Sequence, residues 1–265
     1  MGNEFFDTKK ENFINFKLLN IMNTNKSASL EAKLVNSKGL LTTIKDLSKY
    51  NPSSEIIKIE NYENFINESD GAVTQYKTAS GNLQSAGMNA NAAFEKLVII
   101  SRSIRSEIQE LKGDSSAEAE AINSVVKLIT GENVAEHSKM KKKVLKRLKE
   151  GEDPPQFSSV SALDHESRLG NFRTLIGILK TFKFYEPFDA EITVASLEAL
   201  EIELKKRLDE IAEMEIAYTN QRSRVINYFN GEHGLKIRAV RAKKHVKRKY
   251  GINSPEYKLL TNKIY

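Results

Sequence analysis

The chain has 265 residues, of which 40% are hydrophobic and 29% charged, and its formal net charge is +6. This composition is typical of a globular protein, and the absence of cysteine excludes disulfides, thiolate catalysis and cysteine-ligated zinc. No stretch approaches the roughly 18 uncharged apolar residues of a membrane-spanning helix, and no uninterrupted apolar signal-peptide core follows Met1. We therefore expect a cytoplasmic protein, with secretion independent of a signal peptide as the alternative.

The first predicted helix follows an N-terminal segment, residues 1–26, whose role the pattern leaves open. It begins near Ser27 or Ser29, because serine is a favoured N-cap residue. The helix ends before the turn Tyr50-Asn51-Pro52, since proline cannot continue a helix.

The next predicted helix is long and covers residues 70–112, ending at Gly113. Its apolar and small residues are spaced alternately by three and four, which is typical of a seam that faces a partner helix. Small residues such as Gly87 and Ala90 are expected to let that partner approach closely. A third helix is predicted over residues 115–129, before Gly131-Glu132-Asn133. The predicted seam residues of the long helix are Val73, Tyr76, Leu83, Gly87, Ala90, Phe94, Leu97, Ile104 and Ile108.

A basic, proline-containing segment, residues 139–157, follows and is predicted to be a linker. Its cations are candidates for contact with an anion or a nucleic acid. They are Lys139, Lys141, Lys142, Lys143, Lys146 and Arg147.

The second half of the chain follows the same order of elements. A helix is predicted from near Ser161 to the turn Tyr185-Glu186-Pro187, a long helix over residues 189–230 ends at Gly231, and a third helix covers residues 235–249. The predicted seam of this long helix consists of Leu197, Leu200, Leu204, Ile211, Met214, Tyr218 and Val225.

These correspondences predict an internal duplication. The repeats are expected at residues 27–138 and 158–265, with additional residues in the first repeat after Pro52. The predicted fold is all-α: an elongated helical bundle of two diverged three-helix repeats with two long, coiled-coil-like helices. The pattern leaves open whether the long helices pair within the chain or between subunits.

The stretch from His245 to Lys258, which contains Val-Lys-Arg-Lys-Tyr-Gly-Ile-Asn-Ser-Pro-Glu-Tyr, resembles a group of uncharacterised bacterial helical proteins. Their C-terminal pattern is Val-Lys-x-x-Tyr/Phe-Gly-x-x-Ser-Pro-x-Tyr-Lys. The resemblance covers mainly residues 185–262, and only faintly the first repeat. It implies a two-repeat helical protein and brings no activity, ligand or site with it.

Motifs that carry chemistry are missing from the sequence. His137, His165, His233 and His245 stand in no Glu-x-x-His or His-Glu-x-x-His context, so we predict surface or capping roles for them. No phosphate-binding glycine loop and no nucleophile motif occurs. We therefore expect no enzyme activity, no cofactor, no metal and no small-molecule substrate.

The clearest functional signal is the charge of the helix over residues 235–249, whose apolar stripe is otherwise surrounded by cations. They predict a surface for an anion or a nucleic-acid backbone. Neutralisation by the acidic stretch 191–215 or by a partner is the competing interpretation. The candidate residues are Lys236, Arg238, Arg241, Lys243, Lys244, Lys247, Arg248 and Lys249.

Three functions remain open from the sequence. The first is a non-enzymatic structural or protein-interaction scaffold that forms a homo-oligomer or a larger assembly. The second is a nucleic-acid-binding protein that uses the two basic segments. The third is a membrane-active helical protein, which the lack of a long apolar hairpin disfavours.

Overall fold

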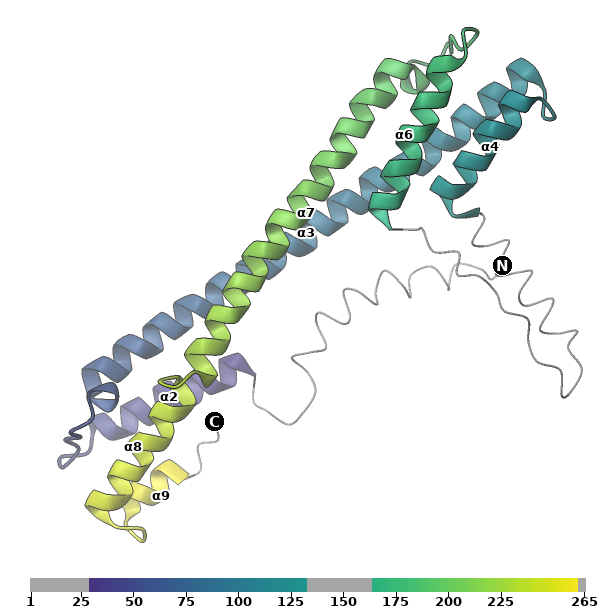
Figure 1. Cartoon of the computed structure of the whole chain (residues 1–265). Coiled ribbons are helices and arrows are strands. Elements are labelled where there is room, and N and C mark those ends of the chain that lie inside the picture. Colours follow the sequence, from purple (N-terminus) through teal and green to yellow (C-terminus); the bar gives the residue numbers. More distant parts are fainter. Residues whose placement is uncertain (1–28, 133–163, 262–265) are drawn as a thin grey trace, which may run out of the picture. The chain divides into compact units, whose positions relative to one another are not determined.

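The computed structural model describes residues 29–132 and 164–261, and within these ranges every regular element is helical, without a β-strand (Figure 1). The predicted all-α class is therefore confirmed. In chain order the elements are α2 (Leu30–Lys45), η1 (Glu55–Ile57), α3 (Ile59–Lys112), α4 (Ala117–Thr130), α6 (His165–Thr181), η2 (Ala190–Ile192), α7 (Val194–Asn230), α8 (Leu235–Tyr250) and α9 (Pro255–Thr261).

The chain forms two compact units, and both long helices contribute to each of them. Within the described residues, unit 1 consists of residues 29–76 and 221–261, and unit 2 of residues 77–132 and 164–220. The units do not coincide with the predicted repeats 27–138 and 158–265, because each unit combines helices from both halves of the sequence.

The core of unit 1 takes at least one apolar side chain from every α-helix in the unit. Ile44 of α2, Tyr62 of α3, Val225 of α7, Val246 of α8 and Leu260 of α9 are almost completely buried in it. The beginning of α3 and the end of α7 run antiparallel within this unit, since Arg224 donates to Gln75 Oε1 over 2.6 Å, while Tyr228 packs with a tilted ring against the earlier Phe65, with ring centroids 5.2 Å apart.

The core of unit 2 is built from α3, α4, α6, η2 and α7. Phe94, Ile122, Phe172 and Leu197 are fully buried in it, and Ile192 of η2 is nearly so. Helices α4 and α6 pack directly against each other (Figure 1). Each unit therefore buries its own apolar stripes, which is what stabilises short helices that would be marginal in isolation.

Side-chain caps begin the shorter helices. Ser29 Oγ accepts the N–H of Ala32 over 3.2 Å, which confirms the predicted start of α2 at that serine. The helix predicted to begin near Ser161 instead begins at His165. Its N-cap is Asp164, whose carboxylate accepts the N–H of Ser167 over 2.7 Å, and this backbone hydrogen bond is the main reason why the pKa of Asp164 is lowered.

Two corners of the chain share one arrangement. The hydroxyl of Tyr50 donates to the carbonyl of Ile57 over 2.8 Å, and the hydroxyl of Tyr185 donates to the carbonyl of Ile192 over 2.7 Å. Burial of both hydroxyls raises their pKa above the ordinary value. A 3₁₀ turn and then a long helix follow each corner.

Helix α3 consequently begins at Ile59 and not at the predicted Asp70. The reason is that Tyr62, Ile66 and Ser69 are buried and continue the three-and-four spacing that leads to Val73. The additional residues of the first half therefore lie inside the helix: α3 has 54 residues, whereas α7 has 37.

None of the predicted seam residues is exposed. Tyr76, Leu83, Gly87, Ile211 and Met214 are half-buried, and the other eleven are buried. The expectation that Gly87 admits a close helix is wrong, because a Cβ added there would meet no atom within 4 Å.

Candidate anion-binding surface

Helix α8 is fixed to unit 1 by its apolar stripe. Leu235, Ala239, Ala242 and Val246 are spaced by four, three and four residues, and each is at most 1% exposed. Because this spacing places them on one side of the helix, the opposite side faces solvent.

The outward side of α8 is cationic, and no acidic residue occurs anywhere in the helix. Six of its cations are exposed and Lys243 is half-buried. We call this set the cationic surface: Lys236, Arg241, Lys243, Lys244, Lys247, Arg248 and Lys249.

Most of the cationic surface has no carboxylate partner within residues 29–132 and 164–261. Among the described residues, none has a carboxylate that forms an ion pair with Lys236, Arg241, Lys244, Lys247 or Lys249. Three other lysines of unit 1 do have carboxylate partners: Lys38 lies 2.6 Å from Asp70, Lys45 lies 2.7 Å from Glu63, and Lys58 lies 2.6 Å from Glu55. The cationic surface differs from these pairs because several cations without such a partner lie together on one helix.

The acidic stretch 191–215 makes its ion pairs inside unit 2. Glu198 pairs with Lys180, and Glu201 pairs with Arg173 over 2.7 Å. Arg207, on the same helix, lies 3.0 Å from the carboxylate of residue 210. The sequence-based interpretation that this stretch neutralises α8 finds no support in these pairings.

Arg238 is a correction to the predicted anion contacts, because its side chain is only 8% exposed. Its guanidinium donates to the carbonyls of His233 over 2.7 Å, of Asn61 over 3.4 Å and of Ile56, and it lies 3.8 Å from the ring centroid of Phe65. Burial lowers its pKa. Arg238 therefore joins α8 and the turn before it to η1 and the start of α3, and it is not available to a ligand.

His245 is also part of the fold. It is 6% exposed and meets the ring of Tyr50 edge-on, with centroids 5.2 Å apart. Burial, and then the charges of Arg248 and Lys249, lower its pKa, so the neutral ring is favoured. The surface or capping role predicted for this histidine is wrong.

The other histidines differ among themselves. His165 is half-buried, stacks on Phe94 with centroids 4.2 Å apart and lies 2.8 Å from Asn91 Oδ1, so it too helps to hold a core together. His233 is exposed, as predicted. His137 and the predicted contacts Lys139 to Arg147 lie outside the described residues.

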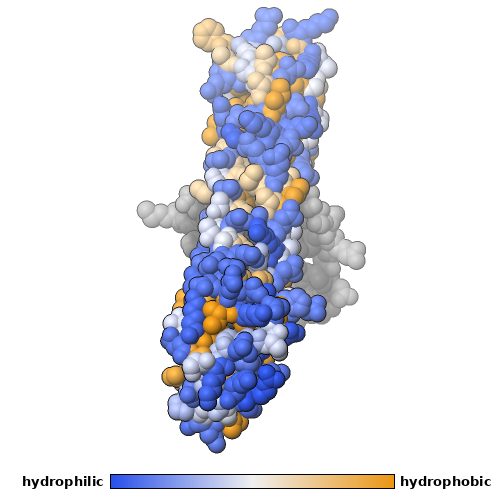
Figure 2. All heavy atoms as spheres, turned by 90° about the vertical axis from the view of Figure 1, so that its left-hand side faces the viewer, coloured by the Kyte–Doolittle hydropathy of each residue, from blue (hydrophilic) through white to orange (hydrophobic). Residues whose placement is uncertain are grey.

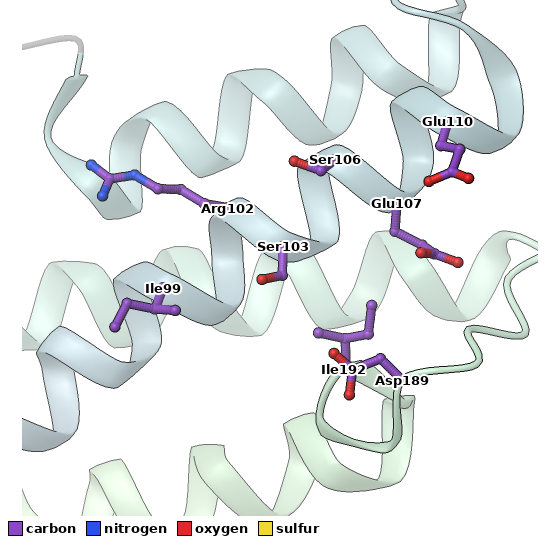
Figure 3. Close-up of a pocket in the computed structure, with 8 residues that line it drawn as sticks. All are labelled: Ile99, Arg102, Ser103, Ser106, Glu107, Glu110, Asp189 and Ile192. Carbon is purple, nitrogen blue, oxygen red and sulfur yellow. The ribbon is translucent and has the colours of Figure 1, made fainter.

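Unit 2 carries a depression of about 490 Å³ between α3 and the corner before α7 (Figure 3). Its polar lining includes Ser103, Ser106, Glu107 and Glu110 of α3. Asp189, from the corner, is exposed and already caps η2 by accepting the N–H of Glu191. Catalytic carboxylates depend on burial to shift their pKa, so we assign no chemistry to this depression.

A metal site and a membrane-spanning helix are two other features that would point to a function. Within residues 29–132 and 164–261, no group of three histidine, aspartate or glutamate side chains is placed to hold a metal ion. In the same ranges, no helix combines the length and the apolar character needed to cross a bilayer. Hydrophilic residues cover most of the face in Figure 2, where hydrophobic residues form separate patches.

Sequence reasoning missed the structural use of Arg238 and His245. A signal was present, because both lie three residues from a member of the apolar stripe, Arg238 after Leu235 and His245 after Ala242. Comparison with protein families, with curated proteins and with solved structures gives no match to the chain.

Proposed function

We propose that the chain is a non-enzymatic interaction protein whose cationic surface binds an acidic macromolecule. The observation that carries this proposal is the row of exposed cations on α8 that lack a carboxylate partner among the described residues. Protein surfaces ordinarily intersperse both signs of charge, whereas a region of one sign creates a potential that attracts the opposite charge.

The perturbed ionisable groups of unit 1 support a binding role over a catalytic one. Shifted pKa values often mark active sites, although structural networks shift them too. In unit 1 the shifted groups are Tyr50, Arg238 and His245, and each is buried against partners that join helices of the unit.

We also propose that the chain consists of two diverged copies of one helical unit, with the long helices as coiled-coil-like rods. The Tyr50 and Tyr185 corners, which use the same hydrogen bond over the same sequence separation, support the duplication. The pairing of short helices supports it as well: α2 contacts α8 in unit 1, and α6 contacts α4 in unit 2. Each pair joins the first helix of one copy to the third helix of the other.

The duplication gives α8 an internal comparison in α4. The α4 stripe is buried in the same way, but its first turn carries Glu118 and Glu120, and its only cation is Lys127. Because a buried stripe alone does not require a cationic outer side, the charge of α8 needs a reason outside packing, and binding supplies one.

A charge-reversal experiment tests the proposed function. The full-length triple variant Lys236→Glu/Lys244→Glu/Lys247→Glu is expected to elute from a heparin column at a lower salt concentration than the unaltered chain. The matched control reverses three exposed lysines of unit 2, Lys96, Lys205 and Lys206. Both variants change the net charge equally, so an equal shift of the two, or no shift of the first, refutes a specific role for α8.

The sequence also led us to expect a homo-oligomer, which size-exclusion chromatography with light scattering tests. A particle of two or more chains is expected. A strict monomer would refute self-association and leave the α8 proposal intact.

A further inference from the structure

We infer that the partner of the cationic surface is the phosphate backbone of a double-stranded nucleic acid, bound without preference for base sequence. This inference rests on the proposed function and names its partner. It is based on the lysine and arginine content of the surface, on the burial of the apolar stripe of α8, and on the small number of exposed apolar and aromatic side chains near it.

The composition of the surface favours a nucleic acid over a protein partner. Protein interfaces are depleted of lysine and enriched in aromatic residues at their centres. The outward side of α8 has the opposite character, since Val240, 40% exposed, is the only large apolar residue of this helix that is exposed. Interfaces with nucleic acids are polar and strongly positive, as this surface is.

The anchoring of α8 argues against a membrane surface. Helices that lie in a bilayer interface insert their apolar side into the lipid. The apolar side of α8 is already buried in unit 1, where Leu235, Ala239 and Val246 are at most 1% exposed. Insertion would require α8 to leave the core of its own unit.

The surroundings of α8 favour a duplex over a single strand. Single-strand binding relies on exposed aromatic rings on which bases stack. No phenylalanine or tyrosine is exposed in the described part of unit 1. Tyr250 is half-buried and its hydroxyl accepts the N–H of Lys49 over 2.8 Å, while Tyr257 packs against the core. Phosphates therefore remain as the groups that this surface can contact.

The spacing and the residue types describe a backbone contact. Lys236 and Lys247 are separated by three helical turns, about 16 Å at 1.5 Å per residue, and Lys243 and Lys244 lie between them. Five of the seven cations of this surface are lysines, which are flexible point charges without the planar fork of arginine. The helix also lacks the asparagine and glutamine side chains that pair with adenine. Binding is therefore expected to follow charge and helical shape.

Fluorescence anisotropy with the full-length chain tests the inference. The probes are duplex DNA and duplex RNA of one sequence, a scrambled duplex, the single strand, polyglutamate, and vesicles containing an anionic lipid. With about five phosphate contacts, the logarithm of the association constant should fall with the logarithm of salt concentration at a slope of about −4.5.

The charge-reversal variants of α8 and of unit 2 give a second measure of the same contacts. Lys236→Glu/Lys244→Glu/Lys247→Glu is expected to weaken duplex binding at least about tenfold and to make the slope less steep by about 2.7, since about three contacts are lost. The Lys96/Lys205/Lys206 control should bind like the unaltered chain, and both duplexes should be insensitive to scrambling. The neutral variant Lys236→Gln/Lys244→Gln/Lys247→Gln, checked by circular dichroism, repeats the test without introducing acids.

The outcomes separate the inference from the proposed function. Tighter binding of duplex than of single strand supports the inference, and the better-bound duplex identifies DNA or RNA as the source of the phosphates. Duplex binding that survives both α8 variants refutes it. Binding through α8 to polyglutamate or vesicles but not to duplex also refutes it, and leaves the proposed function standing. If the α8 variants bind every polyanion like the control, both fail.

Discussion

The burial of Arg238 leads to a stability prediction that separates it from its cationic neighbours. Replacing it with methionine keeps an unbranched apolar stem but removes the donors to the carbonyls of His233, Ile56 and Asn61. Those carbonyls then lose this donor at the partly buried junction of α8 and the turn before it with η1 and the start of α3. Lys236, exposed on the same helix, provides the matched control Lys236→Met.

The magnitude follows from the contacts. A hydrogen bond to a charged group contributes about 1.5 to 3 kcal/mol. Of the three, those to the carbonyls of His233 and Ile56 are short, and the one to Asn61 is longer. The guanidinium over Phe65, 3.8 Å from the ring centroid, adds about 1 kcal/mol. Desolvation of the buried charge opposes these gains. We expect Arg238→Met to lower the free energy of unfolding by about 3 kcal/mol, and Lys236→Met to change it by less than about 0.5 kcal/mol.

Urea unfolding followed by tyrosine fluorescence suits this measurement. The chain has nine tyrosines and no tryptophan, and most of the tyrosines belong to unit 1. Far-ultraviolet circular dichroism reports both units, so a transition that shifts in fluorescence more than in dichroism assigns the loss to unit 1. A loss below about 0.5 kcal/mol for Arg238→Met would refute the reasoning that this arginine stabilises the junction.

Three further predictions concern the corners, the buried histidine and a glycine. Tyr50→Phe and Tyr185→Phe should each lower the free energy of unfolding by about 1 to 2 kcal/mol. Because burial raises the pKa of both hydroxyls, the stability that they contribute is complete below about pH 10 and is lost as the pH rises through the folded-state pKa. Unfolding at pH 8 and above about pH 10 checks this, and an unchanged midpoint would contradict it. For His245 the lowered pKa gives the opposite sign: its contribution to stability is present above about pH 6.5 and is lost as the pH falls through the folded-state pKa. His245→Gln should therefore flatten the acid side of the profile of stability against pH, and a profile that superimposes on that of the unaltered chain would refute the assignment. Gly231→Ala would place a Cβ 2.5 Å from the carbonyl oxygen of Asn227. We therefore expect the free energy of unfolding, measured by heat or urea, to fall by more than about 1 kcal/mol. An unchanged free energy would show that the close approach relaxes freely.

The existence and type of the helices could be predicted because apolar spacing is a local property. The α2 cap at Ser29 and the extent of α8 were both readable from the sequence. The start of α3 was readable too, since Tyr62 and Ile66 continue its stripe, but it was missed. The short helix α9 was not predicted, although a serine N-cap followed by Pro255 is a typical helix start.

The assignment of helices to a common core could not be predicted in this way. Apolar stripes accept many partners of similar volume, so spacing along the chain does not say which stripe meets which. The packing of α2 with α8 joins residues from opposite ends of the sequence. The Tyr50 corner, which follows α2, takes part in this packing because the ring of Tyr50 meets His245 of α8, a contact that is visible only in three dimensions.

The candidate surface was predicted except for its buried member. Lysine and arginine content indicates where positive charge is concentrated, but it does not say which cation faces inward. Arg238 follows Leu235 by three residues and precedes Ala242 by four, so helical geometry places it on the buried stripe. A test of every cation against the stripe would have separated Arg238 from Lys236 and Lys244.

The charge of α8 should itself reduce stability, which gives a final prediction. Lys244 precedes Arg248 by four residues and Lys247 by three, and it follows Arg241 by three, so it takes part in three like-charge contacts. Each such contact costs about 0.2 to 0.5 kcal/mol on an exposed helix, whereas the favourable helix dipole is confined to the last turn, beyond Lys244. Lys244→Glu should therefore raise the free energy of unfolding by about 1 kcal/mol in low salt and weaken duplex binding at the same time. Opposite effects on stability and binding are the signature of a surface kept for a ligand. If urea unfolding instead shows a loss of stability, the reasoning that these like charges cost stability is refuted, and the binding measurement alone then decides the role of the surface.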